Sequence, residues 1–167
     1  KDVKALHYTS NENEYNFRIL DAVMTVNQLQ RENFFLKIKA NCPGSLQGKT
    51  IGLWGLAFKP NTDDIREAPS LYLIEKLLEE GANVRAFDPE AKENVKEIFG
   101  DKVYYAENQY DAVEGADFLA IVTEWSVFRT PDFDRLKSML SLPLIFDGRN
   151  LYDLDQMREH GFEYHSI

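Results

Sequence analysis

The sequence predicts an α/β fold in which a doubly wound, mostly parallel sheet is preceded by a long α-helix. Three observations support this prediction. Residues from about 13 to 39 include no Gly or Pro and repeat apolar side chains at helical spacing. After Gly48, short apolar runs alternate with amphipathic helical segments. These apolar runs lack an alternating polar face, so we expect helices to cover both faces of the sheet.

The long helix is predicted over residues 13–39, which at 1.5 Å per residue is roughly 40 Å. Its apolar side chains recur at steps of three and four residues or their multiples; they are Ile19, Leu20, Val23, Val26, Phe34 and Ile38. The breakers Cys42-Pro43-Gly44-Ser45 end it. The chain divides near Pro43 into residues 1–43 and residues 44–167, and we expect the latter to form the sheet domain. Because a single α/β domain offers the stripe no partner, we expect the long helix to drive self-association.

The sheet domain is predicted to alternate strands with helices. The expected strands are the apolar runs 50–58, 83–89, 103–106, 117–123, 142–146 and 162–167. The expected helices between them are 70–80, 91–99, 109–114, 133–140 and 154–160, and glycines at 81, 100 and 115 end three of them.

Composition excludes several classes of function. The chain has 19 Lys+Arg against 28 Asp+Glu, a formal charge of −9, which disfavours nucleic acids and anionic membranes as partners. The single cysteine, Cys42, allows no internal disulfide, as is usual in a reducing compartment, so we expect a cytoplasmic location. No apolar run reaches the ~18 residues that cross a bilayer. No spacing of Cys, His and acidic residues fits a metal site.

The segment after the first predicted strand is the first candidate site, because ligands of such sheets bind beyond the carboxyl ends of the strands. Gly52 and Gly55 form only a G-x-x-G, so the G-x-G-x-x-G fingerprint of a dinucleotide site is absent. About ten mostly polar residues then precede the next helix. They include Lys59 and Arg66, which suit phosphate groups. The alternative is a solvated loop whose acidic residues pair with these cations.

Three further positions follow other strands. Arg149 follows Asp147-Gly148 and could face the same ligand as Lys59, or it could simply follow a turn. Asp88 could bind a ribose hydroxyl, but without the glycine fingerprint a turn or helix-capping role is favoured. Glu124-Trp125 could line a cleft or cap the sheet.

Four motifs together resemble the C-terminal domain of UDP-glucose/GDP-mannose dehydrogenases. The first is long and specific, Gly55-Leu-Ala-Phe-Lys-Pro-Asn-Thr-Asp-Asp-Ile-Arg-Glu-Ala-Pro-Ser70. It is followed by Phe87-Asp-Pro89, Thr123-Glu-Trp125 and Asp147-Gly-Arg-Asn150. The resemblance covers essentially the whole chain. It implies that residues 44–167 are a Rossmann-like UDP-sugar-binding domain and that the long helix is the family's central helix, which builds a homodimer.

The resemblance also implies an activity, the NAD-dependent two-step oxidation of UDP-glucose to UDP-glucuronate. The motifs resemble the UDP-glucose 6-dehydrogenase branch more than the others. A UDP-N-acetylhexosamine dehydrogenase, a GDP-mannose dehydrogenase and a non-catalytic nucleotide-sugar-binding module remain alternatives. In this family NAD is bound mainly by an N-terminal domain, which this sequence does not contain.

Residue roles follow from the resemblance position by position. Phe58, Lys59 and Arg149 match substrate contacts, and Arg66 matches an arginine that reaches the NAD. The start of the chain resembles the stretch directly after the family's catalytic cysteine. Asp2 then matches the aspartate that orients or activates water, and Lys1 a residue that touches the cofactor. Because Cys42 does not match the nucleophile, we expect the chain by itself to be a catalytically inactive fragment.

Overall fold

A computed structural model describes residues 6, 8–9, 12 and 17–167. In chain order its elements are α2 (Arg18–Asn41), β1 (Thr50–Trp54), α3 (Pro69–Glu79), β2 (Asn83–Phe87), α4 (Lys92–Phe99), β3 (Val103–Tyr105), α5 (Gln109–Val113), β4 (Phe118–Ile121), α6 (Phe133–Met139), β5 (Leu144–Asp147), α7 (Leu154–Glu159) and β6 (Glu163–Ser166). Short 3₁₀ turns lie at Gly100–Lys102 and Ser126–Phe128.

The described strands form a six-stranded sheet in the order β3-β2-β1-β4-β5-β6, and every neighbouring pair is parallel. The order reverses between β1 and β4, which is the doubly wound arrangement. Right-handed connections therefore place α3 and α4 on one face and α5, α6 and α7 on the other. The interior strands β4 and β5 are buried throughout, as expected for a sheet that is covered on both faces. The predicted fold class is confirmed.

The first strand is shorter than predicted. The sequence predicts a strand over residues 50–58, but β1 ends at Trp54. Gly55 turns the chain with a φ of 96°, and its N–H donates to the Phe87 carbonyl oxygen at 2.9 Å. A side chain here would clash, since an added Cβ would lie 2.7 Å from the Thr123 nitrogen. The backbone after Gly55 therefore leaves the sheet and enters a loop that runs to α3.

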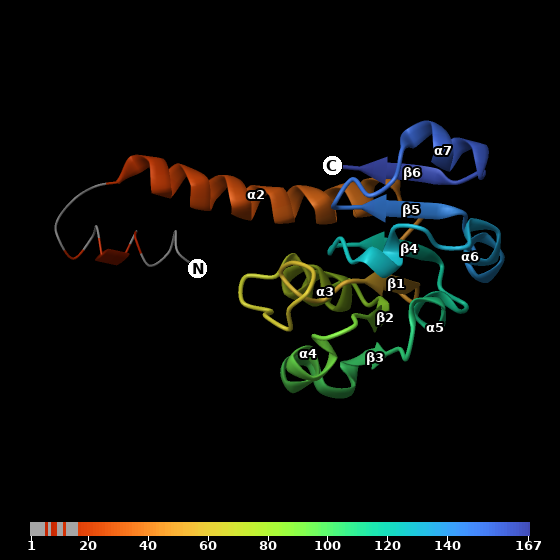
Figure 1. Ribbon diagram of the computed structural model, residues 1–167, viewed down its shortest axis with the longest axis horizontal. Helices are drawn as coiled ribbons and strands as arrows, with labels where there is room; N and C mark the ends of the chain where they lie inside the picture. Colours follow the sequence, from red (N-terminus) through yellow and green to blue (C-terminus); the bar gives the residue numbers. More distant parts are fainter. Residues whose placement is uncertain (1–5, 7, 10–11, 13–16) are drawn as a thin grey trace.

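Helix α2 covers 24 residues and docks on the domain through its C-terminal half. Figure 1 shows it beside β5 and β6, with its N-terminal half extending beyond their carboxyl ends. Arg31 forms an ion pair of 3.1 Å with Glu67, and the Lys37 ammonium donates to the Ser166 carbonyl oxygen. The described part of the chain contains no helix long and apolar enough to cross a membrane.

The apolar stripe predicted for this helix separates into two sets. One set, Phe34 and Ile38, packs into the domain core together with Phe35, which the predicted stripe did not include. Leu20 is buried as well but lies outside that core. The other set is exposed and contains Ile19, Val23 and Val26, of which Ile19 is 69% and Val26 is 55% exposed. Residues 25–30 are all exposed, because this part of the helix lies beyond the sheet. Residues 13–16, with which the predicted helix begins, lie outside the described residues.

Candidate functional site

A cavity of about 1020 Å³ lies at the carboxyl ends of the strands, where α2 passes over the loops that follow β1, β4 and β5. Its walls include Arg31 and Phe34 from α2, Phe58 from the loop after β1, Tyr72 from α3 and Arg149 from the loop after β5. We call it the carboxyl-edge cavity. The lining also includes the carboxylates of Asp21 and Glu67. The two arginines suit a ligand that has negative charge, and the three aromatic rings suit one that has a flat apolar part.

The Arg149 side chain is held by oxygens of two other loops. Its Nε donates to the Val122 carbonyl oxygen at 3.0 Å, and its Nη2 donates to the Phe58 carbonyl oxygen at 2.9 Å. Nε also forms an ion pair of 2.8 Å with Glu124 Oε2. Contacts from loops after β1 and β4 thus fix a guanidinium that is supplied by the loop after β5.

The turn that carries Arg149 is organised by the buried carboxylate of Asp147 at the end of β5. Oδ1 accepts from the Arg149 N–H at 2.7 Å. Oδ2 accepts from the Leu151 N–H at 2.7 Å and from the Tyr164 hydroxyl at 2.8 Å. Burial, followed by the nearby Asp147 charge, raises the pKa of Tyr164, so this hydroxyl stays protonated and donates.

Phe58 lines the carboxyl-edge cavity, and Lys59 follows it in the chain. The Phe58 N–H donates to the Asp64 carbonyl oxygen at 2.8 Å, and its ring is 45% exposed. Lys59 is exposed, and among the described residues no ion pair or hydrogen bond engages its ammonium group. The bond from Arg149 to the Phe58 carbonyl brings the main chain beside Lys59 up to the Arg149 guanidinium. The sequence suggested that Lys59 and Arg149 could face the same ligand, and this hydrogen bond joins Arg149 to the residue before Lys59.

Arg66 points elsewhere in the same loop and already has a partner. Its Nε donates to Asp64 Oδ1 at 2.7 Å, and the Asp64 carboxylate raises the pKa of Arg66. Its side chain is 62% exposed, so it can reach a group outside this domain. The candidates Lys1 and Asp2 lie outside the described residues.

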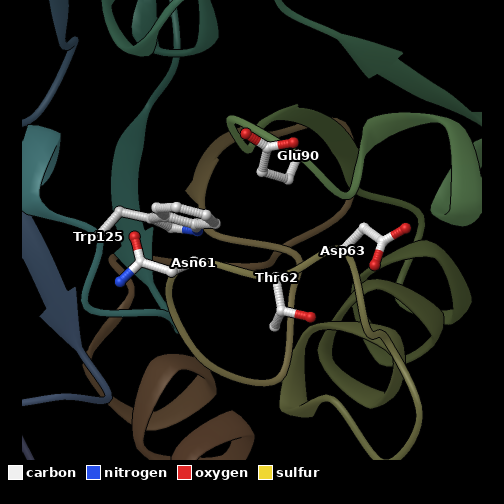
Figure 2. Close-up of a pocket in the computed structure, with 5 residues that line it drawn as sticks. All are labelled: Asn61, Thr62, Asp63, Glu90 and Trp125. Atoms are coloured by element: carbon white, nitrogen blue, oxygen red, sulfur yellow. The ribbon is translucent and has the colours of Figure 1, made fainter.

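A second pocket of about 550 Å³ lies between the loops that follow β1, β2 and β4 (Figure 2). It is lined by Asn61, Thr62, Asp63, Glu90 and Trp125. Doubly wound sheets commonly bind dinucleotides in this crevice. Here the lining residues include two carboxylates and no cation, which disfavours a pyrophosphate.

Asp88, at the end of β2, has no oxygen left for a ribose hydroxyl. Oδ2 accepts from the N–H groups of Leu56 and Ala57 and from the Trp125 indole at 2.6, 3.0 and 2.9 Å. Oδ1 accepts from the N–H groups of Glu90 and Ala91, both at 2.9 Å. Five donors saturate a carboxylate, which has about four lone-pair positions. The predicted turn role is confirmed, and Asp88 also fastens the loop after β1. The residues at this crevice do not fit NAD.

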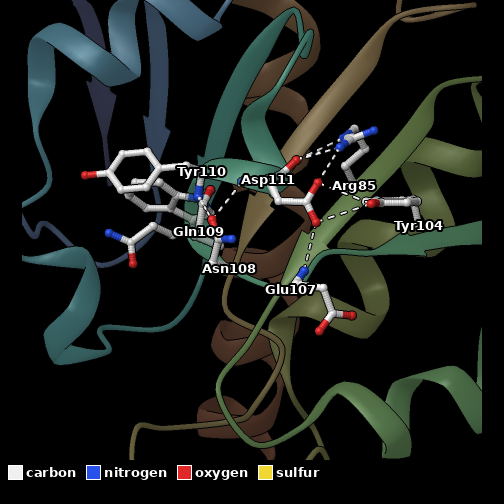
Figure 3. Close-up of polar contacts among 8 residues, drawn as sticks. Arg85, Tyr104, Glu107, Asn108, Gln109, Tyr110 and Asp111 are labelled. Carbon is white, nitrogen blue, oxygen red and sulfur yellow. Dashed lines mark hydrogen bonds and ion pairs between the residues drawn. The ribbon is translucent and has the colours of Figure 1, made fainter.

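Another polar cluster lies on the α5 side of the sheet (Figure 3). The Arg85 guanidinium donates to Asp111 Oδ1 at 2.8 Å and stacks 4.1 Å from the Tyr104 ring centre. The Glu107 N–H donates to the other Asp111 oxygen at 2.8 Å. Asn108 caps the helix by accepting from the Asp111 N–H at 3.0 Å. The polar groups of this cluster pair with one another. We therefore assign the cluster a structural role, in which it anchors α5 on β2 and β3.

Sequence reasoning missed Arg31 and Tyr164. Arg31 lies in a helix that was examined only for its apolar stripe, although its place one turn before Phe34 puts it near the buried face. Tyr164 lies in the last predicted strand, and nothing local connects it with Asp147, which is 17 residues away. Glu124 was considered as a cleft residue, but its pairing with Arg149 was not foreseen.

Comparison with known proteins gives consistent matches. Residues 52–154 match the profile described as UDP-glucose/GDP-mannose dehydrogenase family, UDP binding domain. The chain is 46% identical over 172 aligned residues to UDP-glucose 6-dehydrogenase of Pseudomonas aeruginosa, and 39% identical over 167 residues to that of Rhizobium meliloti. Both alignments cover the whole of this chain and 38% of the relative.

A solved structure agrees with these matches. The UDP-glucose dehydrogenase from the hyperthermophilic archaeon Pyrobaculum islandicum superposes with a TM-score of 0.80 and 29% identity. The superposition covers 98% of this chain and 35% of that one. The chain thus spans a little over a third of the length of these relatives.

Proposed function

We propose that this chain, which belongs to the UDP-glucose/GDP-mannose dehydrogenase family, forms the UDP-sugar-binding part of a UDP-glucose 6-dehydrogenase. The observation that supports this most strongly is Arg149, fixed by the Val122 and Phe58 carbonyl oxygens on the wall of the carboxyl-edge cavity. A guanidinium that is oriented before the ligand arrives loses little freedom when a phosphate binds.

The diphosphate of a UDP-sugar needs cations, and besides Arg31, which is paired with Glu67, this region offers two of different character. Arg149 is rigid and planar, whereas Lys59 is an exposed ammonium on a flexible stem. In this proposal both neutralise the diphosphate, and the exposed ring of Phe58 contacts an apolar part of the ligand. This division of roles also agrees with the motif positions of all three residues.

NAD supplies the oxidising chemistry in the family, and we propose that residues outside this chain hold most of it. The saturated Asp88 and the acidic second pocket support this assignment. Arg66, which is largely exposed, is proposed to reach the cofactor. Lys1 is proposed to touch the cofactor and Asp2 to orient water, both from their motif positions alone. The chain by itself is then expected to bind substrate without turning it over.

We further propose that residues 1–43 link and dimerise the enzyme, while residues 44–167 form the binding domain. The exposed apolar residues Ile19, Val23 and Val26 on α2 support self-association, because burying them between two helices would remove them from water. A cytoplasmic location is proposed from the single cysteine, Cys42, which allows no disulfide within the chain.

Calorimetric titration of the chain with UDP tests the binding proposal. We expect the wild-type chain to bind UDP, and Lys59→Ala to weaken binding about tenfold, the typical worth of one charged contact. Lys96→Ala removes an equally exposed ammonium from α4 and should leave the affinity unchanged. No binding by the wild-type chain would reject the proposed function, whereas equal affinities of wild type and Lys59→Ala would remove only Lys59.

The choice of sugar is tested on the whole enzyme. Formation of NADH with UDP-glucose should exceed formation with GDP-mannose and with UDP-N-acetylhexosamines. A preference for either competitor would move the protein to another branch of the family.

A further inference from the structure

Glu124 follows β4 and approaches the Arg149 guanidinium from the protein side. Its Oε2 lies 2.8 Å from Arg149 Nε, and this oxygen is buried without any hydrogen bond. The two side chains are 31% and 29% exposed, so water screens the pair only partly. The Glu124 carboxylate therefore acts on Arg149 mainly through its charge.

The direction of the guanidinium has a different origin. The Val122 carbonyl oxygen accepts from Nε at 3.0 Å, and the Phe58 carbonyl oxygen accepts from Nη2 at 2.9 Å. Both acceptors are main-chain groups of loops that hydrogen bonds already fix, since the Phe58 N–H donates to the Asp64 carbonyl oxygen. Removing the Glu124 charge should leave the guanidinium where it is. Among the described residues, Arg149 Nη1 has no hydrogen-bond partner and remains for a ligand.

The other arginine in the cavity wall also has a carboxylate partner, which here accepts a hydrogen bond from it. Arg31 forms an ion pair of 3.1 Å with Glu67, and both line the carboxyl-edge cavity. Each arginine of this cavity thus has a carboxylate partner from the protein. An incoming phosphate shares its arginine with that carboxylate, and two negative charges near one guanidinium repel each other.

We propose that Glu124 is an affinity-setting residue, whose charge offsets Arg149 and keeps the binding of the UDP-sugar diphosphate weak enough for release. This inference rests on the proposed function. It goes beyond it because Lys59 and Arg149 are proposed to strengthen binding of the UDP-sugar, whereas the Glu124 carboxylate weakens it. It predicts that removing the charge strengthens binding, whereas a residue that merely orients Arg149 would weaken binding when removed.

The test compares the dissociation constants for UDP of wild type, Glu124→Gln and Glu124→Asp by calorimetry at low and high salt. Glu124→Gln keeps the shape and is expected to bind UDP about fivefold more tightly at low salt, with the gain shrinking as salt screens the charges. Glu124→Asp keeps the charge and should stay near wild type. Circular dichroism and thermal melts establish that each variant is folded.

Glu114→Gln is the matched control. Glu114 is exposed at the end of α5, in the turn that leads into the amino end of β4. The substitution therefore makes the same change in net charge at the opposite edge of the sheet. Its affinity for UDP should not change. Unchanged or weaker binding by Glu124→Gln, or an equal gain in Glu114→Gln, would overturn the inference and leave the proposed function standing. If neither wild type nor Glu124→Gln binds UDP, both fail together.

Discussion

Asp88→Asn is the most informative test of how the loop after β1 is held. The carboxylate accepts five N–H donors, three at Oδ2 and two at Oδ1. An asparagine amide must place its NH₂ group against one of these two sets. The less costly orientation turns the NH₂ toward the N–H groups of Glu90 and Ala91, and these two donors then lose their acceptor.

The expected loss of stability follows from that count. Each buried donor left without an acceptor costs about 1–3 kcal/mol, so Asp88→Asn should lower the free energy of unfolding by about 4 kcal/mol. Domains of this kind are stabilised by about 5–15 kcal/mol in total, so the loss is a large fraction. Urea unfolding followed by circular dichroism measures it, with the midpoint shifting at an unchanged slope.

Asp153→Asn is the control for this substitution. Asp153 is exposed and caps α7, and its Oδ1 accepts from the N–H groups of Asp155 and Gln156 at 2.9 and 3.1 Å. Asparagine caps helices as well as aspartate, so the loss here should stay below about 0.5 kcal/mol. A loss of under about 1 kcal/mol for Asp88→Asn, or one equal to the control, would refute the reasoning about the saturated carboxylate.

Three further predictions concern the backbone, the pH and the helix. Gly55→Ala should cost at least about 3 kcal/mol in urea unfolding, because the position has a φ of 96° and the added methyl would meet a backbone nitrogen at 2.7 Å; a loss of under about 1 kcal/mol would contradict this. Burial raises the pKa of Tyr105 to about 12 and raises those of Tyr152 and Tyr164 as well. The stability that these three tyrosines contribute is therefore fully present below about pH 10, the pKa of a tyrosine in the unfolded chain. It should fall above that pH by about 1.4 kcal/mol per pH unit for each tyrosine until the folded pKa is passed; a flat urea midpoint from pH 8 to 11.5 would disprove it. Val26→Glu should reduce self-association in light scattering without lowering the free energy of unfolding, since this side chain is 55% exposed; an unchanged mass for a self-associating wild type would remove this stripe from the interface.

Local sequence determined the order of elements and the family. Gly and Pro at the ends of apolar runs marked where strands and helices stop, because these residues act on the backbone directly. The long motif from Gly55 to Ser70 and the three shorter ones predicted the dehydrogenase family, and the comparisons confirmed it. The roles of Phe58, Lys59, Arg66 and Arg149 came from the same motifs and stay predictions.

Tertiary structure decided what those residues touch. Arg149 meets a carbonyl oxygen 91 residues away, and Asp88 collects donors from loops after β1, β2 and β4. Neither contact can be derived from neighbouring residues, because it depends on which strands lie side by side and how far each one runs. The sequence by itself determined that cations follow the strands of a parallel sheet. Only the packed sheet decided that one of them is oriented by carbonyl oxygens and offset by the charge of Glu124, since both effects require loops from three strand ends to converge.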